Sequence, residues 1–408
     1  MGNIQFSDRD LAFFMARQPI YDRNMRLFGY ELLYRRSGQS AQCQMGPDVE
    51  LGALSNVLIE VGLDRLSKNH RAFVNVPSSL LGSDALRLLP VKRVVLEVLE
   101  DTPWNPDVES NLRELKKLGY LLALDDYTFG AEHEPFLEHV DIVKVDVLGM
   151  HPDSLRKNMA RIRRRGQTYL AEKVETHTTV EFCRVVGFDF FQGYFIAKPK
   201  TIRGTGIPAN HALSIALLGR LNDPDVSLDE LERLLVGNVV LCHKVLRLVN
   251  SVAMSVSRKI DSMRQALIYL GTAKIRTLAS LAVTTSIAGK PPELYTLALI
   301  RANYCEALAR CVGLPDPEKH FMAGLLSVLD ALIDVAMKDI VAELPVAKEI
   351  SSALCGLPDS PCSITLQHVF AVERGDWRIA DAILTNVPPQ IYSQAIETAQ
   401  RDEQLLAA

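Results

Sequence analysis

The sequence predicts an α/β barrel of the TIM type followed by an all-α helical bundle, and three observations support this prediction. Short apolar runs alternate with helical patterns of about ten residues through the first half of the chain, as in repeated βα units. Nearly every predicted strand carries one polar side chain within or directly after its apolar run. Beyond Pro199 the apolar spacing becomes helical, and nothing there is typical of a strand.

The predicted barrel begins with two apolar runs, 13–21 and 27–35, which a polar turn at 22–24 joins into paired strands. Further strands are expected where short apolar runs lie between turns, at 72–76, 94–99, 121–127, 142–147, 169–174 and 190–197. Helices are expected between them, at 48–68, 79–89, 107–118, 153–165 and 177–186. Six or more such units within about 200 residues favour a closed barrel over an open sheet.

The strand at 121–127 reads LLALDDY and ends in two adjacent carboxylates, Asp125 and Asp126. Neighbouring acids at the mouth of an apolar strand repel each other and lose hydration, so a nearby cation is expected to compensate them. Taken alone, the pair also fits a strand end followed by an acidic turn. The recurrence of polar groups on the other strands favours a divalent metal ion.

These polar groups are expected to meet, because the carboxyl ends of the strands of a TIM-like barrel converge on one face, where enzyme sites lie. The residues are Glu31, Asn75, Glu97, Asp125, Lys144, Glu172 and Gln192. Carboxylate and amide oxygens suit hard divalent cations such as Mg²⁺ or Mn²⁺. A pair of such ions can clamp a phosphodiester and activate water for in-line attack.

Composition and charge argue against several other classes of protein. The formal net charge is −4 and the pI is about 6.2, which gives no electrostatic case for nucleic acid or an anionic membrane. No stretch approaches the roughly 18 uncharged apolar residues that span a bilayer, and the N-terminus does not resemble a signal peptide. Seven scattered cysteines without a Cys-x-x-Cys pair predict reduced thiols and a cytoplasmic location.

The second half is predicted to be a separate domain, because a Gly- and Pro-containing stretch at 201–209 is typical of a linker. The predicted domains are therefore residues 1–200 and 210–408. Leucines repeat at helical spacing between Leu228 and Leu235, and a helical pattern further on is broken at Gly271.

The motifs of the first half resemble those of the EAL family, which are cyclic di-GMP phosphodiesterases built on a modified TIM barrel. The matching segments follow in family order: Arg17-Gln18-Pro19-Ile20, Glu31-Leu32-Leu33-Tyr34-Arg35, Phe73-Val74-Asn75-Val76, Glu97-Val98-Leu99-Glu100, Asp125-Asp126, Lys144-Val145-Asp146, Ala171–Thr176 and Gln192-Gly193-Tyr194. The resemblance implies hydrolysis of one phosphodiester of cyclic di-GMP, giving linear pGpG, with two Mg²⁺ or Mn²⁺ ions.

The resemblance also implies a role for each matching residue. Five residues would hold the two ions, with the last of them on the second ion: Glu31, Asn75, Glu97, Asp125 and Asp126. Lys144 and Glu172 would orient or deprotonate the attacking water, and Gln192 would hold Glu172 or solvent in place. Two would contact the nucleotide: Gln18 and Arg35. Two would brace the loop after the Asp-Asp pair: Glu100 and Glu175.

Two departures from the family pattern leave an alternative open. The family expects Phe-Gly-Thr-Gly after its Asp-Asp pair, whereas Tyr127–Glu134 reads YTFGAEHE, and Lys173 replaces the glycine after Glu172. A working phosphodiesterase is the first interpretation. The alternative is a catalytically weak or inactive cyclic di-GMP receptor or scaffold. A metal-dependent barrel enzyme for another phosphoester is a third interpretation.

The second half resembles the HDOD domain in its segments LRLVNS at 246–251, IDS at 260–262 and QALIYLG at 265–271. Related HD phosphohydrolases need His-Asp where Ser327-Val328 stand here, so this half is predicted to be non-catalytic. The implied role is regulation or the binding of an unidentified protein partner, and a homodimer is a further candidate assembly. His133 and His139 are expected to be surface polar residues rather than ligands, and His243 and His368 to be satisfied or surface histidines.

Overall fold

The computed structural model describes residues 13–36, 63, 67–198, 209–223, 225–252, 260, 262–287 and 290–407. Nearly all of the helix expected at 48–68, and all of the linker expected at 201–209 except its last residue, lie outside the described residues. The chain divides into two compact units, Met1–Ile196 and Ala197–Ala408. Each unit is described by itself.

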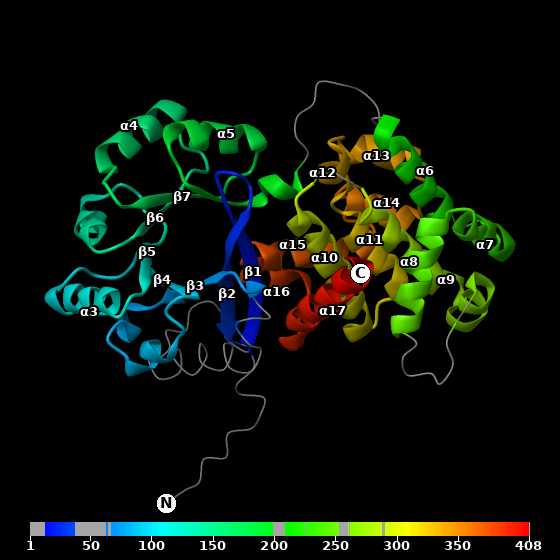
Figure 1. Cartoon of the computed structure of the whole chain (residues 1–408), viewed down its shortest axis with the longest axis horizontal. Helices are drawn as coiled ribbons and strands as arrows, with labels where there is room; N and C mark the ends of the chain where they lie inside the picture. Colours follow the sequence, from blue (N-terminus) through cyan, green and yellow to red (C-terminus); the bar gives the residue numbers. More distant parts are fainter. Residues whose placement is uncertain are drawn as a thin grey trace, which may run out of the picture. The chain divides into compact units, whose positions relative to one another are not determined.

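The first unit is a closed barrel of eight strands whose order around the barrel is their order in the chain (Figure 1). The strands are β1 (Phe13–Asp22), β2 (Leu27–Arg36), β3 (Arg71–Val76), β4 (Val94–Val98), β5 (Leu121–Leu124), β6 (Ile142–Asp146), β7 (Thr168–Glu172) and β8 (Phe190–Gln192). β1 is antiparallel to both of its neighbours, β2 and β8, and the other neighbouring pairs are parallel. The predicted TIM-like barrel is confirmed, with one strand reversed because a short turn joins β1 to β2.

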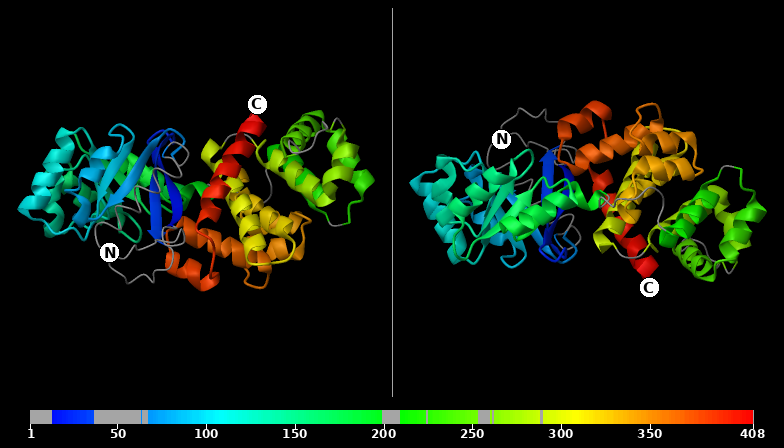
Figure 2. Two further views of the ribbon diagram at one scale, coloured as in Figure 1. Left: turned by 90° about the horizontal axis from the view of Figure 1, so that it is seen from below. Right: turned by 90° about the horizontal axis from the view of Figure 1, so that it is seen from above.

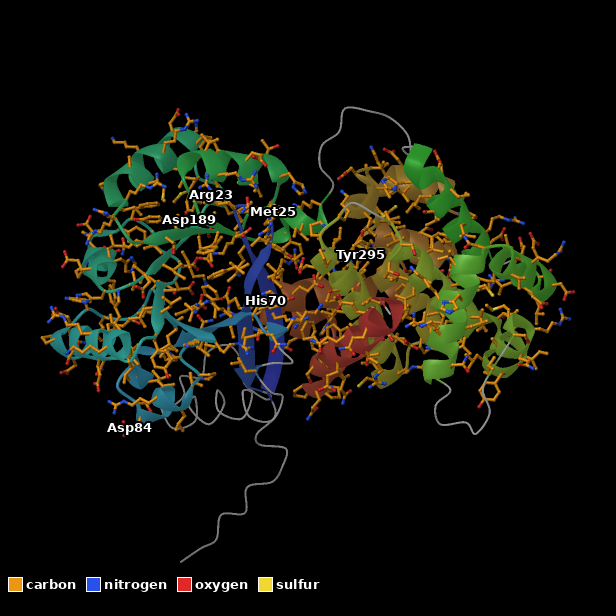
Figure 3. The ribbon with its side chains drawn as sticks, viewed as in Figure 1. Arg23, Met25, His70, Asp84, Asp189 and Tyr295 are labelled. Atoms are coloured by element: carbon orange, nitrogen blue, oxygen red, sulfur yellow. The ribbon has the colours of Figure 1, made fainter. Side chains whose placement is uncertain are left out.

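That short turn also closes the barrel on its amino-terminal side. Arg23, labelled in Figure 3, donates hydrogen bonds from its guanidinium to the backbone carbonyls of Phe188 at 2.7 Å and Arg184 at 3.0 Å. Asp189, also labelled, accepts a hydrogen bond from the backbone N–H of Tyr169 at 3.0 Å. The turn is therefore tied to the residues that lead into the last strand.

Within the described part of the first unit, three helices follow parallel strands and lie outside the barrel (Figure 1): α3 (Pro106–Lys117), α4 (Pro152–Ile162) and α5 (His177–Val186). α3 begins where the Asn105 side chain accepts a hydrogen bond from the backbone N–H of Val108, with Pro106 in the first turn. α5 is capped in the same way by Thr176, and Gly187 ends it in the left-handed conformation.

Several expected elements differ from the structure. The strand expected at 121–127 ends at Leu124, the helix expected at 153–165 ends at Ile162, and two other elements differ more. The segment 79–89 was expected to be helical but forms two 3₁₀ turns, η3 (Ser78–Leu80) and η4 (Asp84–Leu88), because Gly82 and Ser83 interrupt it and a prolonged helix cannot nucleate. The last strand stops at Gln192 rather than at 197. Gly193 has a φ of +144°, and a Cβ there would lie 2.2 Å from the Val174 carbonyl oxygen, so the chain turns into η6 (Tyr194–Ala197).

The barrel interior contains a layer of apolar side chains, which we call the apolar layer. Its members are Ile20, Phe73, Val95, Ala123, Ile142 and Leu170, each at most 2% exposed. Side chains alternate between the two faces of a strand, so residues two positions further along a parallel strand point into the same interior. Those positions are Asn75, Glu97, Asp125, Lys144 and Glu172. In the reversed β1 the equivalent residue lies two positions earlier, at Gln18.

β2 contributes no side chain to the apolar layer because Gly29 stands there. A Cβ on Gly29 would lie 2.7 Å from the backbone oxygen of Arg71 and 3.2 Å from the ring of Phe73. Phe73 fills that space. Glu31 follows two residues later and completes the polar level above.

The second unit is helical throughout its described residues (Figure 2). Its helices are α6 (Ala209–Asn222), α7 (Leu228–Val236), α8 (Val239–Val252), α9 (Met263–Thr284), α10 (Pro292–Cys311), α11 (Pro317–Leu326), α12 (Leu329–Ile333), α13 (Met337–Glu343), α14 (Lys348–Leu354), α15 (Pro361–Glu373), α16 (Trp377–Ile383) and α17 (Gln390–Ala407). The predicted all-α bundle is confirmed. Gly271 interrupts α9 with a φ of +80°, as its sequence pattern predicted.

Among the described helices, α9 has the length and composition to cross a membrane. Of its most apolar window, 56% is buried within the protein, and a long core helix passes the same test. Together with the break at Gly271, this burial identifies α9 as a core helix of the bundle.

Truncation of a side chain in the apolar layer is expected to lower the stability of the barrel. Phe73→Ala should lower the free energy of unfolding by about 3–5 kcal/mol, because it leaves a cavity beneath the polar level. The two tryptophans, Trp104 and Trp377, lie in different units. Trp104 fluorescence during urea unfolding of a Trp377→Phe background therefore reports on the barrel. Leu88→Ala, at an 84% exposed residue, is the control and should change the value by less than about 0.5 kcal/mol.

Candidate functional site

The polar level above the apolar layer gathers one side chain from every strand of the barrel. Glu31, Asn75, Glu97, Lys144, Glu172 and Gln192 lie on β2, β3, β4, β6, β7 and β8, Gln18 lies on β1, and Asp125 directly follows β5. Asn75 pairs in register with Glu97. The structure therefore brings together the constellation that the sequence predicts.

Lys144 lies at the centre of this cluster. Its Nζ atom is 2.6 Å from Glu97 Oε1, 2.6 Å from Asp125 Oδ1 and 2.9 Å from Glu172 Oε1. Glu31 Oε1 is 3.5 Å away. Lys144 and Glu97 are fully buried, while Glu31 and Glu172 are at most 7% exposed. Four carboxylates thus share one ammonium group, which leaves an excess of negative charge in a buried place.

This crowding shifts the proton affinities of the cluster. Burial raises the pKa of Glu97 well above its usual range against the opposing charge of Lys144, and the charges of Glu31 and Asp125 raise it further. Burial similarly raises the pKa of Glu172. Burial alone would lower the pKa of Lys144, but the four surrounding carboxylates together raise it well above its usual range. Lys144 is therefore a charged hydrogen-bond donor and not a free base.

Gln192 joins the cluster to β1. Its amide Nε2 donates hydrogen bonds to Glu31 Oε2 and, at 2.8 Å, to Gln18 Oε1. The amide thus holds the second oxygen of Glu31 while Lys144 lies beside the first. β1, β2 and β8 are linked at the level of the site through these side chains.

Asp126 lies outside this cluster and pairs with Lys173, the residue that replaces the glycine expected after Glu172. Lys173 Nζ donates to Asp126 Oδ1 at 3.2 Å and to Asp146 Oδ2 at 2.6 Å. The hydrogen bond from Lys173 to Asp146 and the two carboxylate charges raise the pKa of Lys173, although burial acts in the opposite direction. In the sequence, the available signal of this ion pair was the lysine at 173, which stands in place of the family's glycine in a segment that also contains the acid Glu175.

The donor set of the cluster fits a divalent cation. Glu97 Oε2 and Glu172 Oε2 are buried and accept no hydrogen bond within the described part of the chain. The carboxylates converge on Lys144, and among the described residues no group of three or more His, Cys, Asp or Glu is placed so that it could hold a metal ion as the side chains stand. The chemistry of the donors suits Mg²⁺ or Mn²⁺, because these ions take oxygen ligands and offset buried negative charge.

The loop after Asp126 is anchored in the barrel wall despite its unusual sequence. Tyr127 is 1% exposed, and its backbone N–H donates to the Lys144 carbonyl at 2.9 Å. The ring of Phe129 packs edge-on against Tyr127, with 5.1 Å between centroids, and Arg161 donates to the Phe129 carbonyl at 2.9 Å. The loop continues into η5 (Ala131–Glu138). Asp126 is thus held between two fixed segments.

Two histidines near this loop are buried, so their prediction as surface residues was wrong. His133 is 8% exposed and its Nε2 lies 2.9 Å from the Glu100 carbonyl oxygen. His139 is 9% exposed and its ring stacks at a tilt near Trp104. Burial lowers the pKa of His139. The apolar run Pro135-Phe136-Leu137 between the two histidines was the available signal of burial.

The remaining predicted site residues lie at the edges of the cluster. Glu100 follows β4, and its backbone carbonyl contacts His133. Burial raises the pKa of the Glu100 side chain, and the charges of Asp125 and Asp126 raise it further. Glu175 is exposed and, with Lys173, lines a cavity of about 400 Å³ between the loops after β6 and β7. Arg35 lies on β2, and its side chain is outside the described residues.

The second unit holds a buried charge network around Ser327. Arg301, 2% exposed, donates from Nε and Nη2 to the two carboxylate oxygens of Glu373 at 2.9 and 2.8 Å. Its Nη1 donates to Ser327 Oγ at 3.1 Å. Val328 is fully buried. Arg301 and Glu373 form a bidentate pair of opposite charges, so the charges of this pair balance without a bound cation. His368 is buried beside Tyr304 and His243 is exposed.

Comparison with known families matches two models in tandem: the EAL domain at residues 7–199 and the HDOD domain at residues 207–387. The chain is 35% identical over 381 residues to a protein of Vibrio cholerae named cyclic di-GMP phosphodiesterase CdgJ, covering 91% of this chain and 88% of that protein. It is 32% identical over 374 residues to the uncharacterized protein YuxH of Bacillus subtilis, covering 89% of this chain and 91% of that protein.

Among solved structures, a standalone EAL protein from Vibrio cholerae O395 in its c-di-GMP-bound form matches with 22% identity and a TM-score of 0.39. That match covers 47% of this chain and 94% of the other chain. An EAL domain protein from Listeria monocytogenes matches with 21% identity and a TM-score of 0.37, over 47% of this chain and 93% of the other.

Loss of the central ammonium should destabilise the metal-free barrel. Lys144→Met leaves four carboxylates without their shared partner, so the free energy of unfolding in EDTA is expected to fall by about 3–5 kcal/mol. Urea unfolding followed by Trp104 fluorescence measures it. Lys117→Met removes an exposed charge at the end of α3 and should change the value by less than about 0.5 kcal/mol. Equal effects of the two changes would contradict the central role of Lys144.

The bundle should become less stable as pH rises, because burial raises the pKa of Asp330 to about 6. The folded state then binds a proton more tightly than the unfolded state, so stability is lost between about pH 4 and pH 6 by roughly 1–3 kcal/mol. Asp330→Asn should remove this loss. Urea unfolding followed by Trp377 fluorescence in a Trp104→Phe background measures it. If the free energy of unfolding depended on pH in the same way with and without Asp330→Asn, the proposed effect of Asp330 would be ruled out.

Proposed function

Because the chain belongs to the family of proteins that join an EAL domain to an HDOD domain, we propose that it is a metal-dependent cyclic di-GMP phosphodiesterase. The product would be linear pGpG, and the HDOD half would be a non-catalytic regulatory or partner-binding domain. The observation that carries this proposal is the convergence of Glu31, Glu97, Asp125 and Glu172 on the single ammonium of Lys144. The six described cysteines are free thiols, which supports a cytoplasmic location.

Two Mg²⁺ or Mn²⁺ ions are proposed at this site. The residues that would hold them are Glu31, Asn75, Glu97, Asp125 and, for the second ion, Asp126. Bound there, such ions would neutralise phosphate charge and lower the pKa of a water molecule. The buried oxygens Glu97 Oε2 and Glu172 Oε2, which accept no hydrogen bond among the described residues, support this assignment.

The chain's own residues would position and deprotonate the nucleophile. Lys144 remains charged between its carboxylates and would donate a hydrogen bond to the attacking water or to the phosphate. Glu172 is bound to Lys144 through Oε1, which leaves Oε2 to accept a proton from that water. Gln192 would keep Glu31 in place through its amide.

The nucleotide would lie across the carboxyl ends of the strands. Gln18, held by Gln192 at 2.8 Å, is proposed to contact it from β1. Arg35, near the carboxyl end of β2, is proposed to contact a phosphate, since a guanidinium can bind two phosphate oxygens at once. Glu100 and Glu175 would brace the segments that carry Asp126 and Glu172.

A second candidate function is a cyclic di-GMP receptor or scaffold with weak or no turnover. The observation that favours it is the ion pair between Lys173 and Asp126, because an ammonium group already neutralises the residue proposed for the second ion. Nucleotide binding by the barrel would then act on the HDOD half without hydrolysis.

The test is incubation of the purified full chain with cyclic di-GMP and Mg²⁺ or Mn²⁺, with chromatographic separation of the products. Linear pGpG is expected, and Glu31→Ala should lower its rate of formation by more than about 100-fold, since changes around metal ligands alone cost roughly 10- to 100-fold. Glu138→Ala, at an exposed glutamate of the same barrel, is the matched control and should retain the rate.

Each outcome decides between the two candidates. Full activity in Glu31→Ala would reject the proposed site. No product from the unmodified chain, with cyclic di-GMP binding still seen by calorimetry, would establish the receptor instead. No binding and no product would reject both.

A further inference from the structure

Lys173 occupies a backbone conformation that a side chain seldom adopts. It directly follows β7 with a φ of +54°, in the left-handed region that costs a non-glycine residue roughly 1–2 kcal/mol. In a continuing strand, the residue after Glu172 would point away from the barrel interior. The left-handed turn instead lets the Lys173 amino group reach two carboxylates at the edge of the site.

Both carboxylates belong to segments that carry residues of the proposed site, Lys144 on β6 and Asp125 after β5. Asp146 is the next interior position beyond Lys144 on β6, and Asp126 directly follows Asp125. Lys173 Nζ lies 2.6 Å from Asp146 Oδ2, and 3.2 and 3.4 Å from the two oxygens of Asp126. The ammonium therefore faces both oxygens through which Asp126 could bind an ion.

Asp126 is strained in the same way as its partner, with a φ of +38°. Two left-handed residues from different loops thus meet in one ion pair. Strain of this kind persists where the surrounding contacts fix the conformation. The Asp126 backbone lies between the buried Tyr127 on one side and Asp125, which Lys144 binds, on the other, and its carboxylate faces Lys173.

We propose that Lys173 is a tethered cation that takes the place of the second divalent ion at Asp126. The barrel would then bind one divalent ion tightly at the Glu31, Glu97 and Asp125 cluster and a second only when Lys173 is displaced. This inference rests on the proposed metal site and makes Lys173 a residue that determines metal stoichiometry. An Mg²⁺ or Mn²⁺ ion must approach a carboxylate oxygen to about 2.1 Å, so it competes with the ammonium for the same face of Asp126.

The test counts the Mn²⁺ ions bound by the chelator-treated full chain, using calorimetry and the electron paramagnetic resonance signal of free Mn²⁺. Lys173→Met keeps the side-chain length and the backbone strain but removes the charge. Lys173→Arg keeps the charge. Lys117→Met removes the same charge from the exposed end of α3, at the amino-terminal side of the strands. Lys173→Gly, which also relieves the strain, is a second charge-free variant.

One tight Mn²⁺ site is expected in the unmodified chain, in Lys173→Arg and in Lys117→Met. Lys173→Met and Lys173→Gly are expected to bind a second ion about tenfold or more tightly than the unmodified chain does. Thermal unfolding of each variant in EDTA establishes that it is folded. The readout is stoichiometry and affinity, so it does not depend on turnover.

The inference and the proposed function fail in different ways. Two equally tight ions in the unmodified chain, or one ion regardless of the residue at 173, would overturn the role of Lys173 and leave the metal site standing. No ion in any of the five proteins would overturn the metal site and the inference together.

Discussion

The barrel depends on a single buried ammonium surrounded by more negative charge than it can neutralise. Lys144 brings Glu97, Asp125 and Glu172 within 2.9 Å and Glu31 within 3.5 Å, in a place where unpaired charges are costly. β2, β4, β6 and β7 each supply a member of this cluster, Asp125 directly follows β5, and Gln192 on β8 holds Glu31 through a hydrogen bond. The imbalance stores electrostatic free energy that a bound cation can release, so the feature that weakens the metal-free fold is the one that suits it to bind metal.

The two units treat buried charge in opposite ways. In the bundle, Arg301 and Glu373 form a bidentate pair of equal and opposite charges, with Ser327 accepting a further hydrogen bond. This arrangement is complete without a ligand. Ser327 and Val328 stand where the resemblance to HD enzymes implies a His-Asp pair, and the Arg301 guanidinium lies against Ser327. The barrel retains its excess of carboxylates.

The residues of the site could be predicted from the sequence because side chains alternate strictly between the two faces of a strand. The apolar layer and the polar level are separated by two residues on each strand, so Phe73 and Asn75, or Leu170 and Glu172, could be assigned to one face from the sequence alone. Features that depend on local backbone angles were harder to predict. The early end of β8 at Gly193 and the burial of His133 and His139 result from tertiary contacts, whereas the 3₁₀ turns at 78–88 follow from the interruption at Gly82 and Ser83. The reach of Lys173 depends on one φ angle that no periodicity encodes.

The reversed first strand has a consequence for how this barrel can be joined to other polypeptides. Because β1 is antiparallel to β2, its first residue, Phe13, pairs with Arg36 at the carboxyl edge of the parallel strands, the edge where the site lies. In a barrel of parallel strands only, the chain would enter at the opposite edge. A polypeptide fused ahead of β1 is therefore delivered to the mouth of the site, and an upstream sensor could act on substrate access without passing a signal through the barrel core.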